Sequence, residues 1–315
     1  MELGTWNLEL GTWNLELGTW NLELGTWNLE LGTWNSELGT RNSAIYYARI
    51  LIPDPIAITH RKASYLCRMQ KILSYPLSVI HLVLFFLMLL IFHPIQLICH
   101  WIGGHDLHQK SVAILNLCLM GTQLPLFNTF SIKYEQDLPI GPSYIFVSNH
   151  QSMFDIPPLI YYLRKYYPKF VAKKELAKNI PSISLNLRIG ENCAIDRKDR
   201  LQSLKALTAF AKNVHEKNRS VVIFAEGTRS RTGVPKPFQR GGLLTIFSQV
   251  PDAIVVPVTV NNSWKVDRYG KFPFGIGNHI SVTVHKPMPI ASKDPNEIIE
   301  AAQSVVHNSI TSTAV

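Results

Sequence analysis

The fold is decided by the stretch YIFVSNHQSMFD (Tyr144–Asp155), in which a short apolar run passes directly into polar residues. Its first five residues, Tyr144–Ser148, are mostly aromatic and β-branched, which predicts a buried strand. A candidate helix over Met153–Tyr166 follows. A buried strand that leads into a helix is the unit from which α/β sheets are built.

The same alternation continues from about residue 110 to the end of the chain. The other expected strands are Lys169–Ala172, Ser220–Phe224, Ala253–Val260 and His279–His285. The other expected helices are Arg200–Lys217, Gly242–Gln249 and Asn296–Ser309. Residues 110–315 are therefore predicted to form an α/β catalytic domain with a central, mostly buried sheet flanked by helices.

Two of these elements carry more detailed expectations. One face of the helix over Arg200–Lys217 is expected to pack on the sheet, because its apolar residues are spaced three or four apart. These residues are Leu201, Leu204, Leu207, Phe210 and Val214. Pro257 lies inside the strand over Ala253–Val260, and a proline in a strand favours an edge strand or a bulge. A kinked core strand is the alternative.

A histidine and an aspartate follow the strand Tyr144–Ser148. On one continuous helix, His150 and Asp155 would lie about 140° apart. If His150 instead precedes the helix and Asp155 lies in its first turn, the carboxylate can bond to the imidazole. Such a bond fixes the tautomer of the ring and stabilises the imidazolium that forms when the ring takes up a proton. An isolated HxxxxD pair is more often structural, with the histidine ending a strand and the aspartate capping a helix.

The stretch VVIFAEGTRS (221–230) is a second strand that ends in polar residues. We expect four polar side chains to be displayed at the edge of the sheet, namely Glu226, Thr228, Arg229 and Ser230. Gly227 permits a close backbone approach, and a guanidinium binds phosphate through paired hydrogen bonds. The stretch is therefore a candidate phosphate-binding turn, with a solvated surface turn as the alternative. Asp196 and Arg197, after a shorter apolar run, are either a structural ion pair or a second phosphate contact.

An apolar segment precedes the α/β region. Residues 72–105 contain no Asp, Glu, Lys or Arg, and Leu77–Phe92 within them is almost continuously apolar. A helix that spans a bilayer needs about 20 such residues. Because Pro94 interrupts the segment, two interpretations stay open: one transmembrane helix, or a bent helical hairpin that enters one leaflet and returns. Basic residues before the segment and Trp101 at its far end favour membrane contact in both cases.

Residues 1–43 repeat a seven-residue unit, ELGTWNL, in near copies that begin at Glu2 and at every seventh residue to Glu37. The Gly, Thr and Asn in each unit oppose a coiled coil. We expect this region to be disordered and residues 44–71 to be a linker. Alternatively, translation begins at Met69 and the preceding residues are an artefact of start-site choice, or the tryptophans bind a membrane interface.

Composition and charge restrict the classes of function. Charged residues make up 17% of the chain, below the usual value of about 25% for soluble domains. Of the 31 basic and 22 acidic residues, one basic and six acidic residues lie in 1–43, so the remainder carries a formal charge of +14. Such a charge attracts anionic lipid, phosphorylated substrates or nucleic acid. The four cysteines are too far apart in sequence for a metal knuckle or CxxC pair, which favours reduced thiols on the cytoplasmic side.

Four blocks, taken in order and spacing, resemble the lysophospholipid acyltransferase family, in particular the 1-acylglycerol-3-phosphate acyltransferases. The blocks are Asn149–Asp155, Ala194–Arg197, Phe224–Ser230 and Val256–Val258. The run VAKKEL, which contains Lys173 and Lys174, is also similar to the family. The resemblance covers roughly Met69 to Pro289 and leaves the N-terminal repeat without a counterpart.

The resemblance implies transfer of a fatty acyl group from acyl-CoA or acyl carrier protein to the 2-hydroxyl of lysophosphatidate, which gives phosphatidate. His150 would remove the hydroxyl proton and Asp155 would orient His150. The substrate-binding residues that it implies are Asn149, Lys174, Arg197, Glu226, Gly227, Thr228 and Arg229. The enzyme would act at a membrane, with its catalytic domain on the cytoplasmic face. No metal or cofactor is expected, because the chain has no zinc, P-loop or dinucleotide fingerprint.

Three alternatives remain open from the sequence. The same chemistry could act on another lysophospholipid or on a lyso-aminolipid. A serine or thioester hydrolase is disfavoured because no GxSxG occurs. A basic module that binds a membrane or nucleic acid without catalysis is the non-enzymatic possibility.

Overall fold

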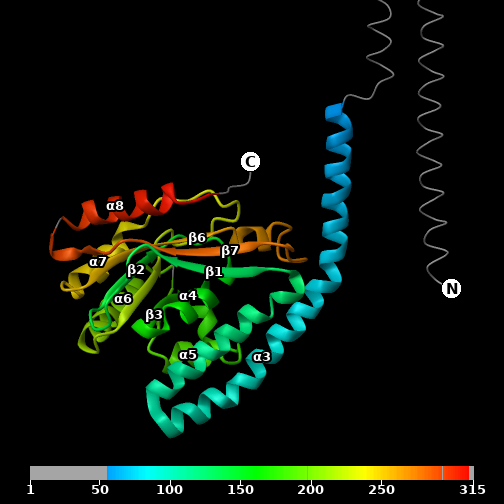
Figure 1. The fold of residues 1–315 in the computed structure, drawn as a ribbon. Coiled ribbons are helices and arrows are strands. Elements are labelled where there is room, and N and C mark those ends of the chain that lie inside the picture. The colour runs from blue at the N-terminus through cyan, green and yellow to red at the C-terminus, as the bar shows by residue number, and fades with distance from the viewer. Residues whose placement is uncertain (1–54, 197, 293, 312–315) are drawn as a thin grey trace, which may run out of the picture. The chain divides into compact units, whose positions relative to one another are not determined.

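The computed structural model describes residues 55–311 apart from 197 and 293, and their side chains from Arg68 onward except that of Ser292 (Figure 1). Met69–Val315 form one compact unit. The expected disorder of 1–43, most of the 44–71 linker and the question of the start site lie outside the described residues.

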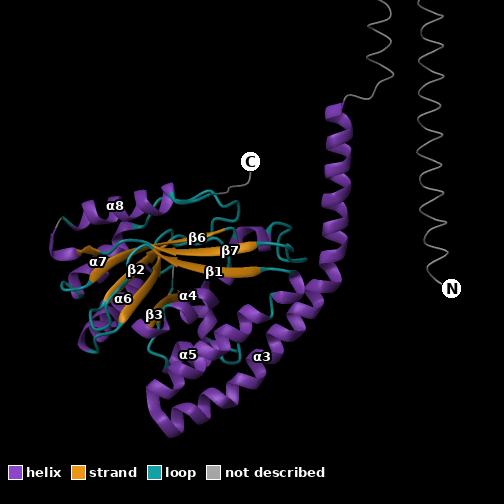
Figure 2. Ribbon diagram, viewed as in Figure 1, coloured by secondary structure: helices purple, strands orange, loops and turns teal. Residues whose placement is uncertain are grey.

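The described residues contain one sheet of eight strands (Figure 2). The strands are β1 (Thr129–Tyr134), β2 (Tyr144–Ser148), β3 (Pro168–Lys173), β4 (Cys193–Ile195), β5 (Ser220–Phe224), β6 (Ile254–Asn261), β7 (His279–Val284) and β8 (Met288–Pro289). Their order is β1-β7-β6-β2-β5-β3-β4, with β8 paired to β6. The neighbouring pairs from β6 to β4 are all parallel, whereas β7 runs antiparallel to β6. Five strands therefore end at the same edge of the sheet, where ligand sites of open α/β sheets lie.

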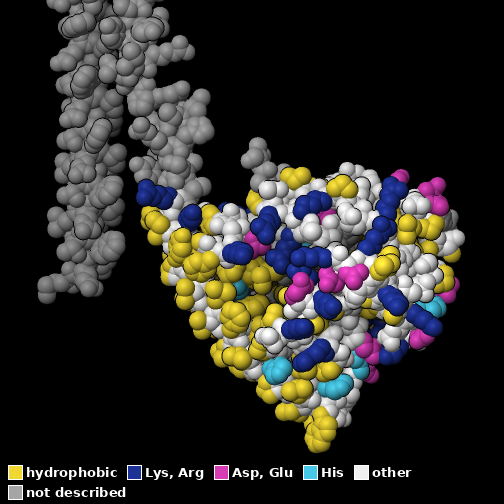
Figure 3. Space-filling view, turned by 180° about the vertical axis from the view of Figure 1, so that it is seen from behind, with side chains coloured by type: hydrophobic (Ala, Val, Ile, Leu, Met, Phe, Trp, Pro, Cys, Tyr) yellow, Lys and Arg dark blue, Asp and Glu magenta, His cyan; other side chains and the backbone are white. Residues whose placement is uncertain are grey.

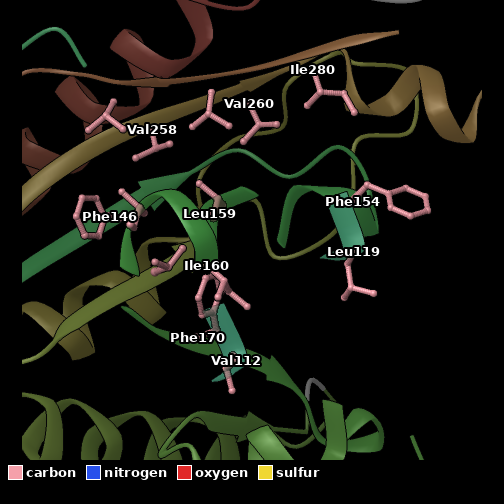
Figure 4. Close-up of a cluster of buried hydrophobic side chains, with 14 of the residues drawn as sticks. Val112, Leu119, Phe146, Phe154, Leu159, Ile160, Phe170, Val258, Val260 and Ile280 are labelled. Atoms are coloured by element: carbon pink, nitrogen blue, oxygen red, sulfur yellow. The ribbon is translucent and has the colours of Figure 1, made fainter. Parts of the chain in front are cut away.

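Helices cover both faces of this sheet. The helices after the first are α4 (Ile156–Tyr162), α5 (Ile183–Ile189), α6 (Arg200–Glu216), α7 (Arg240–Gln249) and α8 (Pro295–Asn308). Side chains of β2 alternate between the two cores: Tyr144 and Phe146 pack with α4, while Ile145 and Val147 pack with α6, α7 and α8. Figure 4 shows part of the first core, where Phe146 and Val258 of the sheet lie near Leu159. The predicted α/β class with a buried, helix-flanked sheet is confirmed.

Some elements differ from the sequence prediction. The expected helix over Met153–Tyr166 is three pieces: η2 (Met153–Asp155), α4 and η3 (Arg164–Tyr166). Pro157 and Pro158 fall in the first turn of α4, where missing N–H groups cost nothing. Strands β1 and β4 and helix α5 were not predicted, because β1 is half-exposed without a clean alternation and the other two are short.

One detailed expectation is wrong and one of two alternatives holds for another. Leu201 on α6 is 82% exposed, so the apolar face that packs begins further along the helix. Pro257 lies in a central strand, as the core-strand alternative had it, and is paired opposite Val147 of β2. Strand β8 pairs with Ile254 and Val255, and strand β7 pairs from Val258 onward. Because Pro257 falls between these two partners, its missing N–H leaves no strand without a hydrogen bond.

The apolar segment forms α3 (Pro55–Gly121), which turns back on itself (Figure 1). The turn is made at Gly103 and Gly104, where Gly104 has φ 59° and ψ −145°, a conformation essentially reserved for glycine. We call residues 68–102 the first arm and residues 105–121 the second arm. The helix continues through Pro94, where the sequence suggested an interruption, so the apolar residues 77–102 lie on one arm and the turn follows them.

The first arm has an inverted distribution of side chains. Its buried face carries polar residues, among them Ser74, Ser78, His81 and Gln96. Its outward face is apolar, with Val79, Val83, Phe86, Leu87 and Leu90 between 44 and 60% exposed. This face forms part of the broad apolar area in Figure 3. An exposed apolar patch of this kind marks a contact surface for a membrane or a protein.

Candidate active site

The turn after β2 is organised around the carboxylate of Asp155. Oδ2 of Asp155 accepts hydrogen bonds from Nδ1 of His150 at 2.8 Å, from the backbone N of Gln151 at 2.7 Å and from the backbone N of Ser152 at 3.0 Å. Its Oδ1 accepts the hydroxyl of Ser263. Asp155 is fully buried. A buried carboxylate that accepts this many donors is stabilised in its ionised form.

His150 is fixed on three sides. Because an ionised carboxylate can only accept, Nδ1 carries the proton and Nε2 keeps a lone pair. The ring stacks on Phe224 of β5, with 4.0 Å between the ring centroids and 19° between the planes. The backbone N–H of His150 donates to Oε1 of Glu226 at 3.2 Å, and its carbonyl accepts the N–H of Ser230 at 2.7 Å. The side chain is mostly buried, with 8% of its surface exposed, so the ring is held in one orientation.

The loop after β5 wraps against this turn. Gly227 has φ +69°, and a Cβ at this position would approach Cγ of Gln239 to 3.3 Å, which explains why the position is a glycine. Of the four residues expected at the sheet edge, Thr228 and Arg229 are exposed. Glu226 and Ser230 are instead buried, because the loop folds back onto the backbone of His150. Burial raises the pKa of Glu226 to about 7.

Cationic side chains surround the outer part of the same loop. Nζ of Lys236 donates to Oγ1 of Thr228 at 3.0 Å and to the carbonyl of Arg229 at 2.8 Å. Asp267 lies close enough to Arg229 and Arg231 to feel their charges, although burial is the larger effect and raises the pKa of its carboxyl. Figure 3 shows basic side chains gathered beside the apolar surface. Exposed cations on a tight turn can bind an anionic group.

The remaining predicted residues lie in different places. Asn149 bonds to the backbone of Val260 through both atoms of its amide, at 2.9 and 2.8 Å, and thereby extends the pairing of β2 with β6. Lys174 is exposed at the start of η4 (Lys174–Ala177), after the carboxyl end of β3. Among the described residues, no hydrogen bond joins Lys174 to the turn at 149–155. Arg197 lies outside the described residues, and Oδ1 of its neighbour Asp196 accepts the backbone N of Lys198.

The sequence reasoning missed Ser263 and Asp267. Both lie just past the end of β6, on η5 (Ser263–Asp267). Ser263 bonds to Asp155, and Asp267 accepts the hydroxyl of Ser152 at 2.7 Å. Polar residues at the carboxyl ends of neighbouring parallel strands meet at one edge of the sheet. This rule led to the residues after β2 and β5, and the same rule applied to β6 would have pointed to Ser263.

Residues 130–261 match the family model described as "Acyltransferase". Over this stretch the chain is similar to the acyltransferase family. The chain is 29% identical over 218 residues to a 1-acyl-sn-glycerol-3-phosphate acyltransferase of Saccharomyces cerevisiae, a match that covers 67% of each chain. It is 28% identical over 197 residues to a protein of the same description from Chlamydomonas reinhardtii, covering 62% of this chain and 57% of that protein.

The fold of the chain is also similar to a solved structure. The 1-acyl-sn-glycerophosphate acyltransferase PlsC of Thermotoga maritima superimposes with a TM-score of 0.61 at 20% sequence identity. The superposition covers 73% of this chain and 93% of that one. The turn at 149–155 and the loop at 226–230 both lie within the residues that the family model matches.

Proposed function

We propose that this protein moves a fatty acyl group from acyl-CoA or acyl carrier protein to the 2-hydroxyl of 1-acylglycerol 3-phosphate. The observation that carries the proposal is the hydrogen bond from Nδ1 of His150 to Asp155, at the carboxyl end of β2. It leaves Nε2 of His150 as a base beside an exposed cationic loop. The names of the relatives support lysophosphatidate as the acceptor.

Each residue of the pair has a defined task in this mechanism. Nε2 of His150 takes the proton of the acceptor hydroxyl as the hydroxyl oxygen attacks the thioester carbonyl. When the tetrahedral intermediate collapses, the C–S bond breaks and the imidazolium returns this proton to the leaving sulfur, which departs as the thiol of the donor. Asp155 holds the ring and offsets the positive charge of the imidazolium. No acyl-enzyme is required, because donor and acceptor bind together.

The loop after β5 would hold the phosphate of the acceptor. Arg229 and Thr228 are exposed on it, and Lys236 adds a third polar group that already bonds to both. Lys174 and Arg197 remain proposed contacts from their places in the family blocks. Glu226 supports the loop from beneath, through the backbone of His150. For the developing oxyanion, backbone N–H groups of the two loops are the proposed donors.

The first arm would place this site at a membrane surface, where the acceptor and the product reside. The described residues contain one helical segment, Arg68–Leu126, that is long and apolar enough to cross a membrane. With its apolar face outward and its polar face against the domain, the arm is suited to lipid on one side only. We propose that the catalytic domain faces the cytoplasm.

The test is an assay of purified protein with lysophosphatidate and a panel of acyl-CoA and acyl carrier protein donors, with products identified by mass. His150→Ala should reduce turnover by roughly 10²- to 10⁴-fold, the usual contribution of a general base. Asp155→Asn should reduce it by a large factor as well, because the wrong tautomer of the ring is then favoured.

A second histidine–carboxylate pair offers a control. His285, which is buried, and Glu135, which is exposed, are joined at 3.0 Å just after the end of β7. His285→Ala should lower the melting temperature while leaving most of the turnover. Turnover near that of the wild type in His150→Ala would reject the mechanism, and faster transfer to another lysophospholipid would reject the acceptor alone.

A further inference from the structure

The segment after β6 is bonded to the catalytic turn at two points. The hydroxyl of Ser263 donates to Oδ1 of Asp155, and the hydroxyl of Ser152 donates to Oδ2 of Asp267 at 2.7 Å. The two bonds join residues separated by 108 and 115 positions in the chain. Both Ser263 and Asp267 lie beyond residues 130–261, the stretch that matches the family model.

The bond from Ser263 completes the set of donors on the carboxylate. Oδ2 of Asp155 is shared among His150 and two backbone N–H groups, whereas Ser263 is the donor that the described structure provides for Oδ1. Ser263 and Asp155 are both fully buried. Water therefore cannot simply replace the hydroxyl, and its loss leaves one carboxylate oxygen without a partner.

Local backbone geometry holds Ser263 in place. Asn262 adopts the left-handed conformation, with φ 67°, directly after β6, and turns the chain toward the catalytic turn. The side chain of Asn262 donates to the carbonyl of His279 at 3.1 Å, which ties this bend to β7. Asp267 ends the segment beside Arg229 and Arg231 of the cationic loop. The segment therefore links the catalytic turn to the loop that we assign to phosphate.

We propose that Ser263 and Asp267 are positioning residues of the acyl transfer: Ser263 sets the orientation and charge of Asp155, and Asp267 holds the catalytic turn through Ser152. The inference rests on the proposed function of His150 and Asp155. Neither residue touches the reacting atoms. Their effect passes through the carboxylate that orients His150.

Ser263→Ala should lower kcat roughly 10- to 100-fold, as expected for the loss of a hydrogen bond to a buried charge. The KM for lysophosphatidate should stay within about twofold, because no contact to the acceptor is removed. The acidic limb of the pH–rate profile should move to higher pH, since an unsatisfied carboxylate favours the imidazolium more strongly. The titratable groups that face this turn are Asp155, Glu226 and Asp267. Arg229 and Arg231 lie close enough to Asp267 for their charges to act on its carboxyl.

Conservative variants separate positioning from folding. Ser263→Thr keeps the hydroxyl and should restore most of the lost kcat. Asp267→Asn keeps an acceptor for Ser152 and should lose less kcat than Asp267→Ala. Thr259→Val is the matched control, because Thr259 is another buried hydroxyl on the preceding strand, bonded to His285 at 2.8 Å. It should lower the melting temperature and leave both kcat and the pH profile unchanged.

A spectroscopic measurement tests the inference without substrate. The proton between His150 and Asp155 should give a low-field imidazole N–H resonance in protein labelled with ¹⁵N-histidine, assigned by its absence in His150→Gln. Ser263→Ala should shift this resonance and Thr259→Val should not. An unmoved resonance and an unchanged pH profile in folded Ser263→Ala would overturn the inference. Absence of acyl transfer by the wild-type protein would instead overturn the proposed function. The shift of the N–H resonance in Ser263→Ala would still show whether Ser263 acts on the bond between His150 and Asp155.

Discussion

At the scale of single residues, two buried carboxyl groups lie beside His150 in different surroundings. Asp155 is surrounded by donors, whereas Glu226 accepts from the backbone of His150 and is 3% exposed. Burial raises the pKa of Glu226 from 4.5 to about 7. The carboxyl of Glu226 therefore changes its charge in the neutral range.

Glu226 predicts a dependence of stability on pH. Because the folded state binds this proton more tightly than the unfolded state, its contribution is fully present below pH 4.5 and is lost as the pH rises through about 7. The shift corresponds to about 3 kcal/mol. Glu226→Gln should therefore be less stable relative to wild type at pH 5 than at pH 8, as measured by urea unfolding at both values. An equal difference at the two values would contradict the prediction.

Local sequence predicted the central pair but not its supports. His150 and Asp155 belong to one stretch of seven residues, so their meeting requires only a strand end and a helical turn. Ser263 and Asp267 reach the same site only because β6 lies beside β2 in the sheet. The burial of Glu226 also depends on how its loop folds over the turn. These contacts are set by strand order, which spacing along the chain does not reveal.

At the scale of elements, the first arm of α3 differs most from a helix of a soluble protein. Its buried face is fastened by hydrogen bonds rather than by apolar packing alone: His81 donates to the carbonyl of Thr122 at 2.7 Å, and Ser78 accepts the N–H of Phe274 at 2.8 Å. Lys169 of β3 ties the second arm to the sheet through His105 and Gln109, both at 2.8 Å. Hydropathy predicted the apolar segment, but it suggested an interruption at Pro94 and did not predict the turn at Gly103 and Gly104.

The outward face of the first arm predicts binding to lipid. Replacing Val83 and Phe86 by glutamate places two charges on a surface that is now apolar, and should release the protein from liposomes in a sedimentation assay. Leu201→Glu is the control, because Leu201 is an exposed apolar residue on α6 and not on the first arm. Undiminished sedimentation of the double variant would show that the arm does not make the contact.

At the scale of the whole molecule, the parallel strands bring residues from distant parts of the chain to one edge. The alternation of strands and helices was enough to predict this class of fold. It was not enough to predict that β7 would enter the sheet antiparallel, or that β1 would form the far edge beside it. Strand β1 pairs with β7 across 150 residues of sequence, whereas β7 pairs with β6 across only 20 to 26 residues, and the composition of these strands does not specify a direction.

The compact unit that begins at Met69 predicts where the chain can be shortened. A variant that starts at Met69 should keep the melting temperature and acyl transfer of the full chain, since the sheet, both arms and the site all lie within Met69–Val315. A variant that starts at residue 105 lacks the first arm, including Phe85 and Leu89. The apolar core against which these two residues pack is then exposed, so this variant should aggregate. Loss of transfer on starting at Met69 would assign an essential role to the preceding residues.

The polar buried face of the first arm has a consequence for folding during synthesis on the ribosome. Ser78 and Leu89 emerge early from the ribosome, whereas their partners Phe274 and Ser182 follow 196 and 93 residues later. During that interval the polar face of the arm lacks these two partners, while the opposite face already exposes apolar side chains that promote aggregation. We therefore expect the nascent arm to bind a lipid interface or a chaperone until the sheet has been completed.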